Sequence, residues 1–351
     1  MIKYIGSKRV LLPAILSVVE TIPRTETIAD LFSGTARVAH ALKRRGYRVL
    51  ANDHNAYAHT LATCYAQADA ERHTRDAALL IEELNTLPGN PDYITQTYCE
   101  QARYFTPRNG ARIDAIREAI AQKSLNPELE AILLTSLLEA ADRVDSTTGV
   151  QMAYLKSWAP RAHNELKLRV PDVLPSPAAG PCEAHRLDAV DAARMLEADV
   201  VYIDPPYNQH SYLGNYHIWE TLVLWDKPET YGIARKRLDC RDRKSDFNSK
   251  RRFRQALTDL LHAVRAPVLI VSFNNEGFIE RADMESLLSS LHDGENSIKV
   301  IEHDHKRYVG AQIGIHNSQG LKVGRVSHLR NKEYLYIVTR EPAPAPTVTP
   351  A

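Results

Sequence analysis

Short apolar runs that end in polar and turn residues recur along the chain, and they are typical of strands in an α/β sheet. The first two are "TIADLFSG" and "GYRVLANDHN", and the segment between them, "TARVAHALKRRG", has helical spacing and ends at Gly46. Glycine favours the end of a helix, so the pattern predicts a strand–helix–strand unit with a right-handed crossover. Four more strand-like runs follow: "ADVVYID", "APVLIVSFNN", "IKVIEHDH" and "EYLYIVTR".

Between residues 56 and 157 the pattern becomes helical. The segments "RDAALLIEELNTL", "ARIDAIREAIAQK" and "PELEAILLTSLLEAADRV" carry apolar residues three and four positions apart. Residues 171–183 form a proline-rich connector, and the tail "EPAPAPTVTPA" is low in complexity. We expect a sheet domain over residues 1–60 and 171–340, a helical insertion over residues 61–170, and a disordered tail over residues 341–351.

Composition narrows the function only a little. The 351 residues carry a formal net charge of +1, so a nucleic-acid partner has to be inferred from local charge clusters. The four cysteines form no CxxC pair, which indicates a reduced, cytoplasmic protein without structural zinc. The early apolar run "VLLPAILSVV" contains a proline and is interpreted as a packed helix, and no run approaches the length of a membrane span.

Two of the predicted strands end on acids. Asp30 ends the first strand, and Ser33 and Gly34 form the turn that leads into the helix. A carboxylate there suits a cationic group such as an amino acid's ammonium, although an ordinary turn has the same composition. Asp53 ends the second strand 23 residues later, where an acid can accept both hydroxyls of a ribose or cap a helix. The chain has no GxGxxG and no P-loop, which makes a nicotinamide dehydrogenase the least favoured function.

The stretch "VVYIDPPYN" ends an apolar run on Asp204, two prolines and Tyr207. Pro205 and Pro206 lack N–H donors and fix φ, so the chain must turn rigidly where the strand ends. Open α/β sheets bind ligands at this edge. The turn presents a carboxylate, free backbone carbonyls and an aromatic ring, a set that can hold a flat molecule with an exocyclic amine. A plain strand stop with a packed tyrosine is the alternative.

These segments resemble a known family. "ADVVYIDPPYN" is similar to motif IV of amino-methyltransferases that use S-adenosylmethionine, "KYIGSKRVLLPAI" to their motif X, and "IADLFSGTARVA" to their motif I. "ADRVDSTTGVQMAYLKSWAPRA", "YIDPPYNQHSYLGNYHIWET", "VSFNNEGFI" and "LRNKEYLYIVTR" resemble the D12 class of DNA adenine-N6 methyltransferases. The resemblance spans residues 2–340 and implies a Rossmann-like class I methyltransferase sheet with a helical insertion, S-adenosyl-L-methionine as the cofactor, and no metal.

The resemblance also implies roles for individual residues. Lys8 would pair with the carboxylate of the cofactor's methionine part and Asp30 with its ammonium. Asp53 would accept the ribose, and Asp188 would lie near the adenine amino group. The full cofactor set is Tyr4, Lys8, Asp30, Phe32, Gly34, Asp53 and Asp188. The catalytic set, which would act on an adenine flipped out of double-stranded DNA, is Asp204, Pro205, Pro206 and Tyr207.

A basic run follows the DPPY turn. Residues 233–254 hold ten Lys and Arg against three Asp, with little apolar periodicity. We expect a mobile loop that orders on the DNA backbone, with an ordinary solvated loop as the alternative. The candidate DNA contacts are Arg235, Lys236, Arg237, Arg251 and Arg252. The bases would be read by the helical insertion or by residues 303–330, a glycine-containing segment expected to form a flexible hairpin.

Several functions remain open at this point. We expect site-specific methyl transfer to N6 of adenine in DNA, either by an orphan methylase or in a restriction system with a cognate restriction endonuclease. RNA adenine-N6 and DNA cytosine-N4 methyltransferases use similar turns and are alternatives. A non-catalytic cofactor-binding DNA regulator is the alternative from another class. A monomer is expected.

Overall fold

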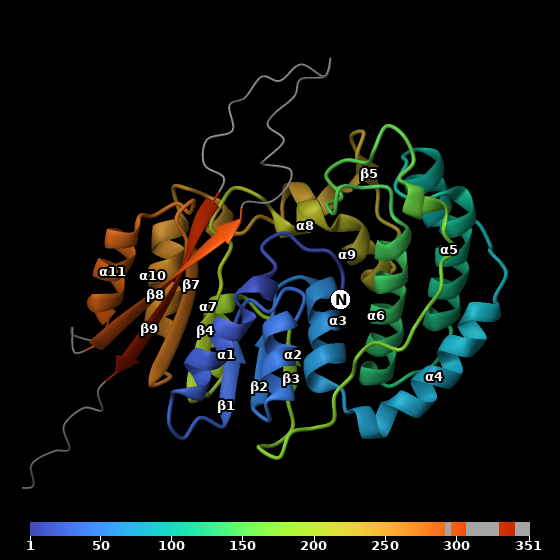
Figure 1. Ribbon diagram of the computed structural model, residues 1–351. Coiled ribbons are helices and arrows are strands. Elements are labelled where there is room, and N and C mark those ends of the chain that lie inside the picture. Colours follow the sequence, from blue (N-terminus) through green and yellow to red (C-terminus); the bar gives the residue numbers. More distant parts are fainter. Residues whose placement is uncertain (292–295, 307–329, 341–351) are drawn as a thin grey trace, which may run out of the picture.

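The computed structural model describes residues 1–291, 296–306 and 330–340. Its main sheet has the strand order β3-β2-β1-β4-β7-β9-β8 (Figure 1). Strand β9 (Arg330–Arg340) pairs antiparallel with both of its neighbours, and the other pairs are parallel. The remaining strands are β1 (Thr27–Asp30), β2 (Arg48–Asn52), β3 (Glu183–His185), β4 (Val200–Ile203), β7 (Val268–Asn274) and β8 (Asn296–Lys306). This is a mostly parallel, Rossmann-like sheet.

Helices cover both faces of the sheet, because its central strands are apolar on both sides. In β7, Val268 and Ile270 belong to one hydrophobic core, whereas Leu269, Val271 and Phe273 belong to the other. The first core contains residues of α1 (Leu12–Glu20), α2 (Arg37–Arg44) and α3 (Ala56–Ala62). The second contains residues of α7 (Ala189–Met195), α10 (Phe253–Ala263) and α11 (Arg281–Ser289). The predicted strand–helix–strand unit and the four later strands are confirmed.

The helical segments after β2 lie in its crossover to β3 and form one end of the molecule (Figure 1). They include α4 (Ala70–Thr86), α5 (Pro107–Ala121) and α6 (Pro127–Val144), which match the three predicted helices. The side chain of Asn126 accepts a hydrogen bond from the N–H of Leu129, and Pro127 follows as the first helical residue, so α6 starts where its sequence dictates. None of the described helices is long and apolar enough to cross a membrane.

Two regions differ from the sequence prediction. Strand β3 lies at the end of the proline-rich connector. Its three residues show no strand pattern in the sequence, and they form a strand because they pair with β2. The basic run was expected to be a mobile loop; the structure gives it short regular elements, and its mobility stays a prediction. It contains β6 (Lys236–Arg237), which pairs with β5 (Thr230–Tyr231), and the 3-10 turns Leu238–Arg241 and Asp246–Asn248. Residues 307–329 of the predicted flexible hairpin, and the tail 341–351, lie outside the described residues.

Glu220 of α9 (His217–Leu224) fixes the basic run to the body of the protein. Its carboxylate is fully buried, accepts the backbone N–H of Tyr57 at 3.0 Å, and accepts Arg243 Nη1 at 2.9 Å. One side chain therefore joins α9, the start of α3 and the segment between the two 3-10 turns. Apolar periodicity does not reveal this contact, because the anchor is an ion pair.

Replacing Glu220 with alanine is expected to lower the free energy of unfolding by about 3 kcal/mol, since it leaves the buried N–H of Tyr57 without its partner and the guanidinium of Arg243 with Asp239 as its remaining carboxylate. Chemical denaturation followed by circular dichroism measures this. Trypsin should also cleave the variant faster after Arg241, Arg243 or Lys244. Glu229→Ala, an exposed acid near the hairpin, is the matched control and should change stability by less than about 0.5 kcal/mol. Equal effects of the two variants would contradict the anchoring role.

Candidate functional site

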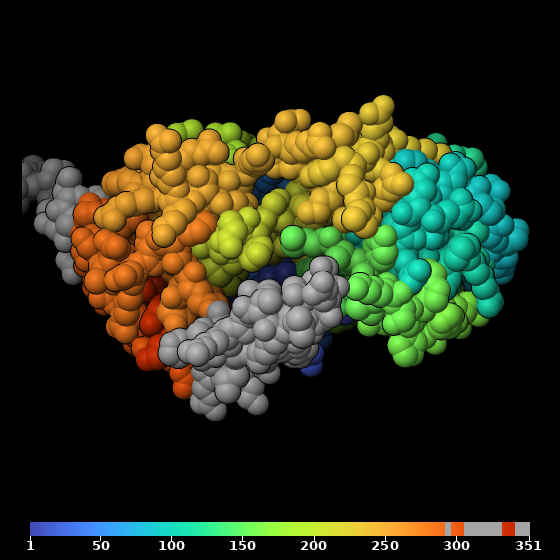
Figure 2. All heavy atoms as spheres, turned by 90° about the horizontal axis from the view of Figure 1, so that it is seen from above, coloured from blue at the N-terminus to red at the C-terminus, as the bar shows by residue number. Residues whose placement is uncertain are grey.

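A cavity of about 430 Å³ opens at the carboxyl edge of the parallel strands. The strand order reverses between β1 and β4, which is where open α/β sheets bind ligands. Figure 2 looks down on the molecule and shows a central hollow, with dark-blue residues of the N-terminal segment inside it. Asp204 and Pro206 line the cavity together with all seven residues that were expected at the cofactor: Tyr4, Lys8, Asp30, Phe32, Gly34, Asp53 and Asp188.

Asp30 brings a buried carboxylate to the floor of this cavity. Its side chain is 1% exposed, and its Oδ1 has no hydrogen-bond partner within the described chain. Burial and the nearby charge of Asp204 raise the pKa of Asp30 well above its usual value. The hydroxyl of Ser33 is buried and lacks a partner among the described residues too. Because unsatisfied buried acceptors are costly, this corner of the cavity suits a cationic hydrogen-bond donor.

Asp53 holds the turn after β1 in shape. Its Oδ2 accepts the N–H of Gly34 and its Oδ1 accepts the N–H of Asn55, both at 3.0 Å. Burial raises the pKa of Asp53, and the two N–H groups oppose that rise. Gly34 has φ +52°, and a Cβ there would lie 3.2 Å from the ring of Tyr4. A side chain at position 34 would therefore be strained and would crowd the cavity wall.

Tyr4 fixes the N-terminal segment across the cavity mouth. Its ring stacks between those of Tyr212 and Tyr216, at centroid distances of 5.1 and 4.6 Å. The N–H of Ile5 donates to the Tyr216 hydroxyl at 2.7 Å. Gly6 follows with φ +73°, and a Cβ there would lie 2.9 Å from the hydroxyl of Tyr212 in α8 (Tyr212–Asn215). These contacts determine where Lys8 enters the cavity.

The opposite wall is apolar with a polar rim. Phe32 is half-buried and meets Phe247 edge to face at 5.2 Å. Asp188 is exposed, and its Oδ1 caps α7 by accepting the N–H of Val190 at 2.9 Å. A flat heterocycle fits such a wall, since the rings offer apolar surface and the free carboxylate oxygen an acceptor.

Lys8 lies between two carboxylates at the DPPY turn. Its side chain is 6% exposed, and its Nζ is 3.0 Å from Asp204 Oδ1 and 3.4 Å from Glu333 Oε2. Burial alone would lower the pKa of Lys8, but the two acids outweigh it and raise the pKa well above its usual value. Burial raises the pKa of Asp204 to about 6, Glu333 adds to the rise, and Lys8 opposes it. The ion pair between Lys8 and the cofactor's carboxylate, which was expected from the sequence, stays a prediction.

The rest of the turn is rigid and packed. Pro205 is buried, and Tyr207 meets Phe273 at 5.8 Å with the rings at 70°. The carbonyl of Tyr207 accepts the N–H of Phe278 at 3.2 Å. Tyr207 is half-buried, and neither it nor Pro205 is among the residues that line the cavity. Its role as a stacking surface for a flipped base stays a prediction.

The five candidate DNA contacts fall into two groups. Arg237 is 3% exposed and makes a two-pronged ion pair with Asp226, with both N···O distances at 2.7 Å, so it supports the hairpin from inside. The other four are more accessible: Arg235, Lys236, Arg251 and Arg252. Of these, Arg252 pairs with Asp246 at 3.0 Å on the exposed surface.

Sequence reasoning missed three residues of this site: Glu333, Glu220 and Phe247. Glu333 reaches the site because β9 is antiparallel, and its register opposite Asn274 brings it to the carboxyl edge of β7. Its position within the family-like segment "LRNKEYLYIVTR" is the one feature that could have drawn attention to it. Glu220 follows the DPPY turn in "GNYHIWET", and Phe247 is the apolar residue inside the basic run.

The carboxyl group of Asp204 is expected to titrate with a pKa of about 6 in the wild-type protein. Glu333→Gln should lower this pKa, because it removes a negative charge that resists ionisation. Lys8→Met should raise it, because it removes the positive charge that favours the carboxylate. NMR titration of ¹³C-labelled aspartate, with Asp204 assigned by its loss in Asp204→Asn, measures both shifts. A titration midpoint that neither variant moves would show that the three groups do not interact.

Comparison with known proteins agrees with this geometry. A model of the D12 class N6 adenine-specific DNA methyltransferase family matches residues 4–260. Modification methylase StsI of Streptococcus sanguinis is 32% identical over 85% of this chain and 48% of its own length. Type II methyltransferase M.FokI of Planomicrobium okeanokoites is 31% identical over 87% of this chain and 49% of its own length. Type II methyltransferase M.NlaIII of Neisseria lactamica is 26% identical over 88% of this chain and 92% of its own length.

The chain thus spans about half the length of the first two relatives and nearly all of the third. The family match runs from the N-terminal segment at Tyr4 through the DPPY turn to α10, so it includes most of the cavity walls. The resemblance inferred from the motifs is confirmed, and this chain belongs to the D12 class of N6 adenine-specific DNA methyltransferases.

Proposed function

We propose that this protein transfers a methyl group from S-adenosyl-L-methionine to N6 of an adenine flipped out of double-stranded DNA. One observation carries the proposal: three neighbouring strands deliver Asp30, Asp53 and Asp204 to a single cavity, beside the rigid DPPY turn. Family membership supports the methyl transfer and the DNA substrate.

The residues present fit the proposed cofactor. The partnerless Oδ1 of Asp30 suits the ammonium of the methionine part, and Asp53 keeps lone pairs for ribose hydroxyls after accepting two N–H bonds. Phe32, Phe247 and Asp188 suit the adenine ring and its amino group. When bound, this cofactor supplies an electrophilic methyl on a positively charged sulfur.

Asp204 would orient the amine that receives the methyl group. An exocyclic amine on adenine is a poor nucleophile, because its lone pair is delocalised into the ring. The Asp204 carboxylate and the carbonyl of Pro205 can accept its two hydrogens, which favours a more tetrahedral nitrogen with its lone pair turned toward the methyl. Catalysis then rests on orientation and electrostatics, and the proton leaves through Asp204 as the nitrogen becomes acidic.

Lys8 would keep Asp204 ready for this step. At neutral pH the nearby ammonium favours the ionised carboxylate, which burial alone would resist. Glu333 shares the charge of Lys8, so the lysine does not neutralise Asp204 completely. The adenine N–H then meets a carboxylate that is charged and still free to accept a hydrogen bond.

A restriction endonuclease and double-stranded DNA are the proposed partners of this protein. The relatives are named modification methylases and type II methyltransferases, which favours a cognate restriction endonuclease that acts on the same DNA site. Double-stranded DNA is the proposed substrate because the target base must come from a duplex. A monomeric state and a cytoplasmic location stay predictions.

The direct test uses purified protein, S-adenosyl-L-methionine with an isotopically labelled methyl, and DNA from a strain without adenine methylation. Mass spectrometry of the digested nucleosides should find labelled N6-methyladenine, and sequencing should map it to one short site. Asp204→Ala should lower the rate at least about 1000-fold while cofactor binding, followed by calorimetry, changes little. Label in N4-methylcytosine or only in RNA would redirect the proposal to those substrates. Cofactor and DNA binding without any transfer would favour a regulator.

The exposed arginines before α10 are expected to contact DNA phosphates. The double change Arg251→Glu and Arg252→Glu should weaken DNA binding and reduce the slope of log K against log salt by up to about 2, because two released counterions are lost. The matched control reverses two exposed charges on α4, Arg72 and Arg75, and should leave both quantities close to wild type. Fluorescence anisotropy at several salt concentrations measures this. Equal effects of the two double variants would mean that net charge, and not contact, governs binding.

A further inference from the structure

The tip of the β5–β6 hairpin carries an apolar side chain in open solvent. Ile233 is 83% exposed, although aliphatic side chains of this size are usually covered. The turn around it is specific, because Gly232 and Arg235 have φ of +68° and +49°. Arg235 and Lys236 follow after Ala234, and neither forms an ion pair with another described residue. The tip thus carries an apolar side chain close in the chain to two cations.

The stem of the hairpin is firmly held. Arg237 joins its second strand to Asp226 and Asp239, and the guanidinium of Arg241 lies 4.1 Å from the ring centroid of Tyr231. The stem that carries Ile233 is thus held by two ion pairs and a cation–π contact.

A second exposed apolar side chain is tied to the same anchor. The hydroxyl of Tyr104 lies 3.0 Å from the carbonyl of Ala234, next to Ile233, and 2.7 Å from the carbonyl of Gln151, next to Met152. Tyr104 and Gln151 are buried, whereas Met152 is 44% exposed. One buried tyrosine therefore fixes the spacing of two apolar tips, which we call the apolar prongs, Ile233 and Met152.

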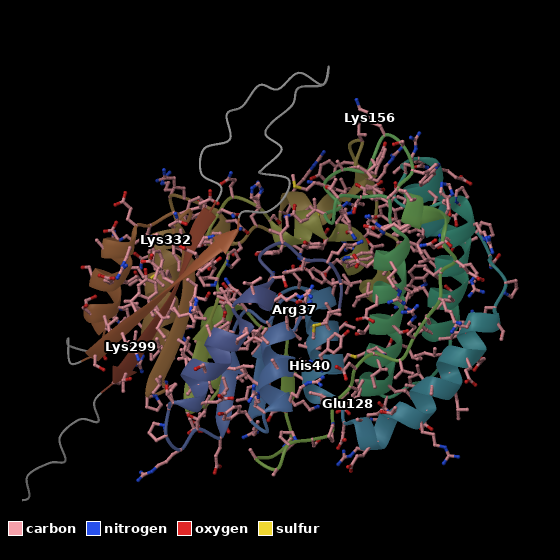
Figure 3. All side chains as sticks on the ribbon, viewed as in Figure 1. Arg37, His40, Glu128, Lys156, Lys299 and Lys332 are labelled. Atoms are coloured by element: carbon pink, nitrogen blue, oxygen red, sulfur yellow. The ribbon has the colours of Figure 1, made fainter. Side chains whose placement is uncertain are left out.

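The hairpin that carries Ile233 lies against α8, a helix that lines the cavity. The ammonium of Lys236 would lie 3.7 Å from a Cβ on Gly214 of α8, and the two residues before Gly214, Tyr212 and Leu213, line the cavity. Figure 1 shows β5 near α8 and α9, above the carboxyl edge of the sheet, and Figure 2 shows residues of this part of the chain around the central hollow. Lys156, on the same loop as Met152, projects outward from the top of the molecule (Figure 3).

We propose that Ile233, assisted by Met152, enters duplex DNA at the base step from which the target adenine leaves. The inference rests on the proposed DNA methylation. Apolar wedges inserted between base steps unstack them and open the duplex, and a flipped base leaves a gap that an aliphatic side chain can fill. Arg235 and Lys236 follow Ile233 in the hairpin and Lys156 lies on the loop of Met152, so each prong has positive charge on its own segment, which suits the phosphates on either side of that step. A duplex is the occupant that uses both features at once.

The test uses short duplexes that contain the methylated site once sequencing has mapped it. Ile233→Ala should lower kcat/KM on the fully paired duplex about tenfold, because the variant must open the stack without the wedge. On the same duplex with an abasic site opposite the target adenine, the variant should stay within about twofold of wild type, because that base is already unpaired. Replacing the target with 2-aminopurine should give a smaller fluorescence rise on binding to Ile233→Ala than to wild type. Leu79→Ala, which removes another exposed aliphatic side chain (59% exposed) on α4, is the matched control and should behave as wild type in all three measurements.

Three outcomes would overturn the wedge. Loss of activity to the same extent on paired and abasic duplexes would make Ile233 a general contact. An unchanged kcat/KM and an unchanged fluorescence rise would remove it from DNA binding, and self-association of the wild type that is lost in Ile233→Ala would assign the tip to a protein interface. If wild-type protein transferred methyl to no DNA, the proposed function would fail and the wedge with it. Normal transfer by wild type with any of the first three results would leave the function standing and reject the wedge alone.

Discussion

The site depends on the concentration of negative charge at one edge of the sheet. Parallel strands end at the same edge, so Asp30, Asp53 and Asp204 are brought together by topology, and burial makes each carboxylate costly. Lys8 offsets part of this cost at the DPPY turn. The charge balance at this edge of the sheet therefore depends on the N-terminal segment, in which the stacking of Tyr4 on Tyr212 and Tyr216 positions Lys8.

Lys8 compensates only part of this negative charge, and the uncompensated part favours the binding of a positively charged ligand. Asp204 has a cation beside it, whereas Oδ1 of Asp30 has no partner within the described chain. An empty cavity with an unsatisfied buried acid is destabilised relative to one that holds a positively charged ligand, so ligand binding and local stability are linked. The two acids thus differ in their surroundings within one cavity, and the proposed function gives them different roles: Asp30 would pair with a cationic group of the cofactor, and Asp204 would accept a hydrogen bond from a neutral amine.

Prediction from the sequence succeeded where a short stretch of chain determines its own structure. Strands β1, β2, β4 and β7 are apolar runs that end in polar or turn residues, and Asn126 and Pro127 determine the start of α6. The site residues at strand ends followed from the same rule. Glu333 could not be predicted, because it reaches Lys8 from 325 positions away through an antiparallel register. The ordered basic run was missed for a related reason: ion pairs to Glu220 and Asp226 hold it, and such partners leave no periodic pattern.

The buried face of α9 couples the rim of the molecule to the cavity. Its first residue, His217, donates from Nε2 to the carbonyl of Gln151 at 3.0 Å, and burial lowers the pKa of His217 to about 3, so the ring stays neutral and this contact persists across physiological pH. One turn later, Glu220 holds Arg243, which lines the cavity. The loop with Met152 and the cavity wall thus share one short helix as their support. A change in the position of that loop would therefore act on the cavity wall through neighbouring hydrogen-bonded groups of α9, without a long-range rearrangement of the sheet.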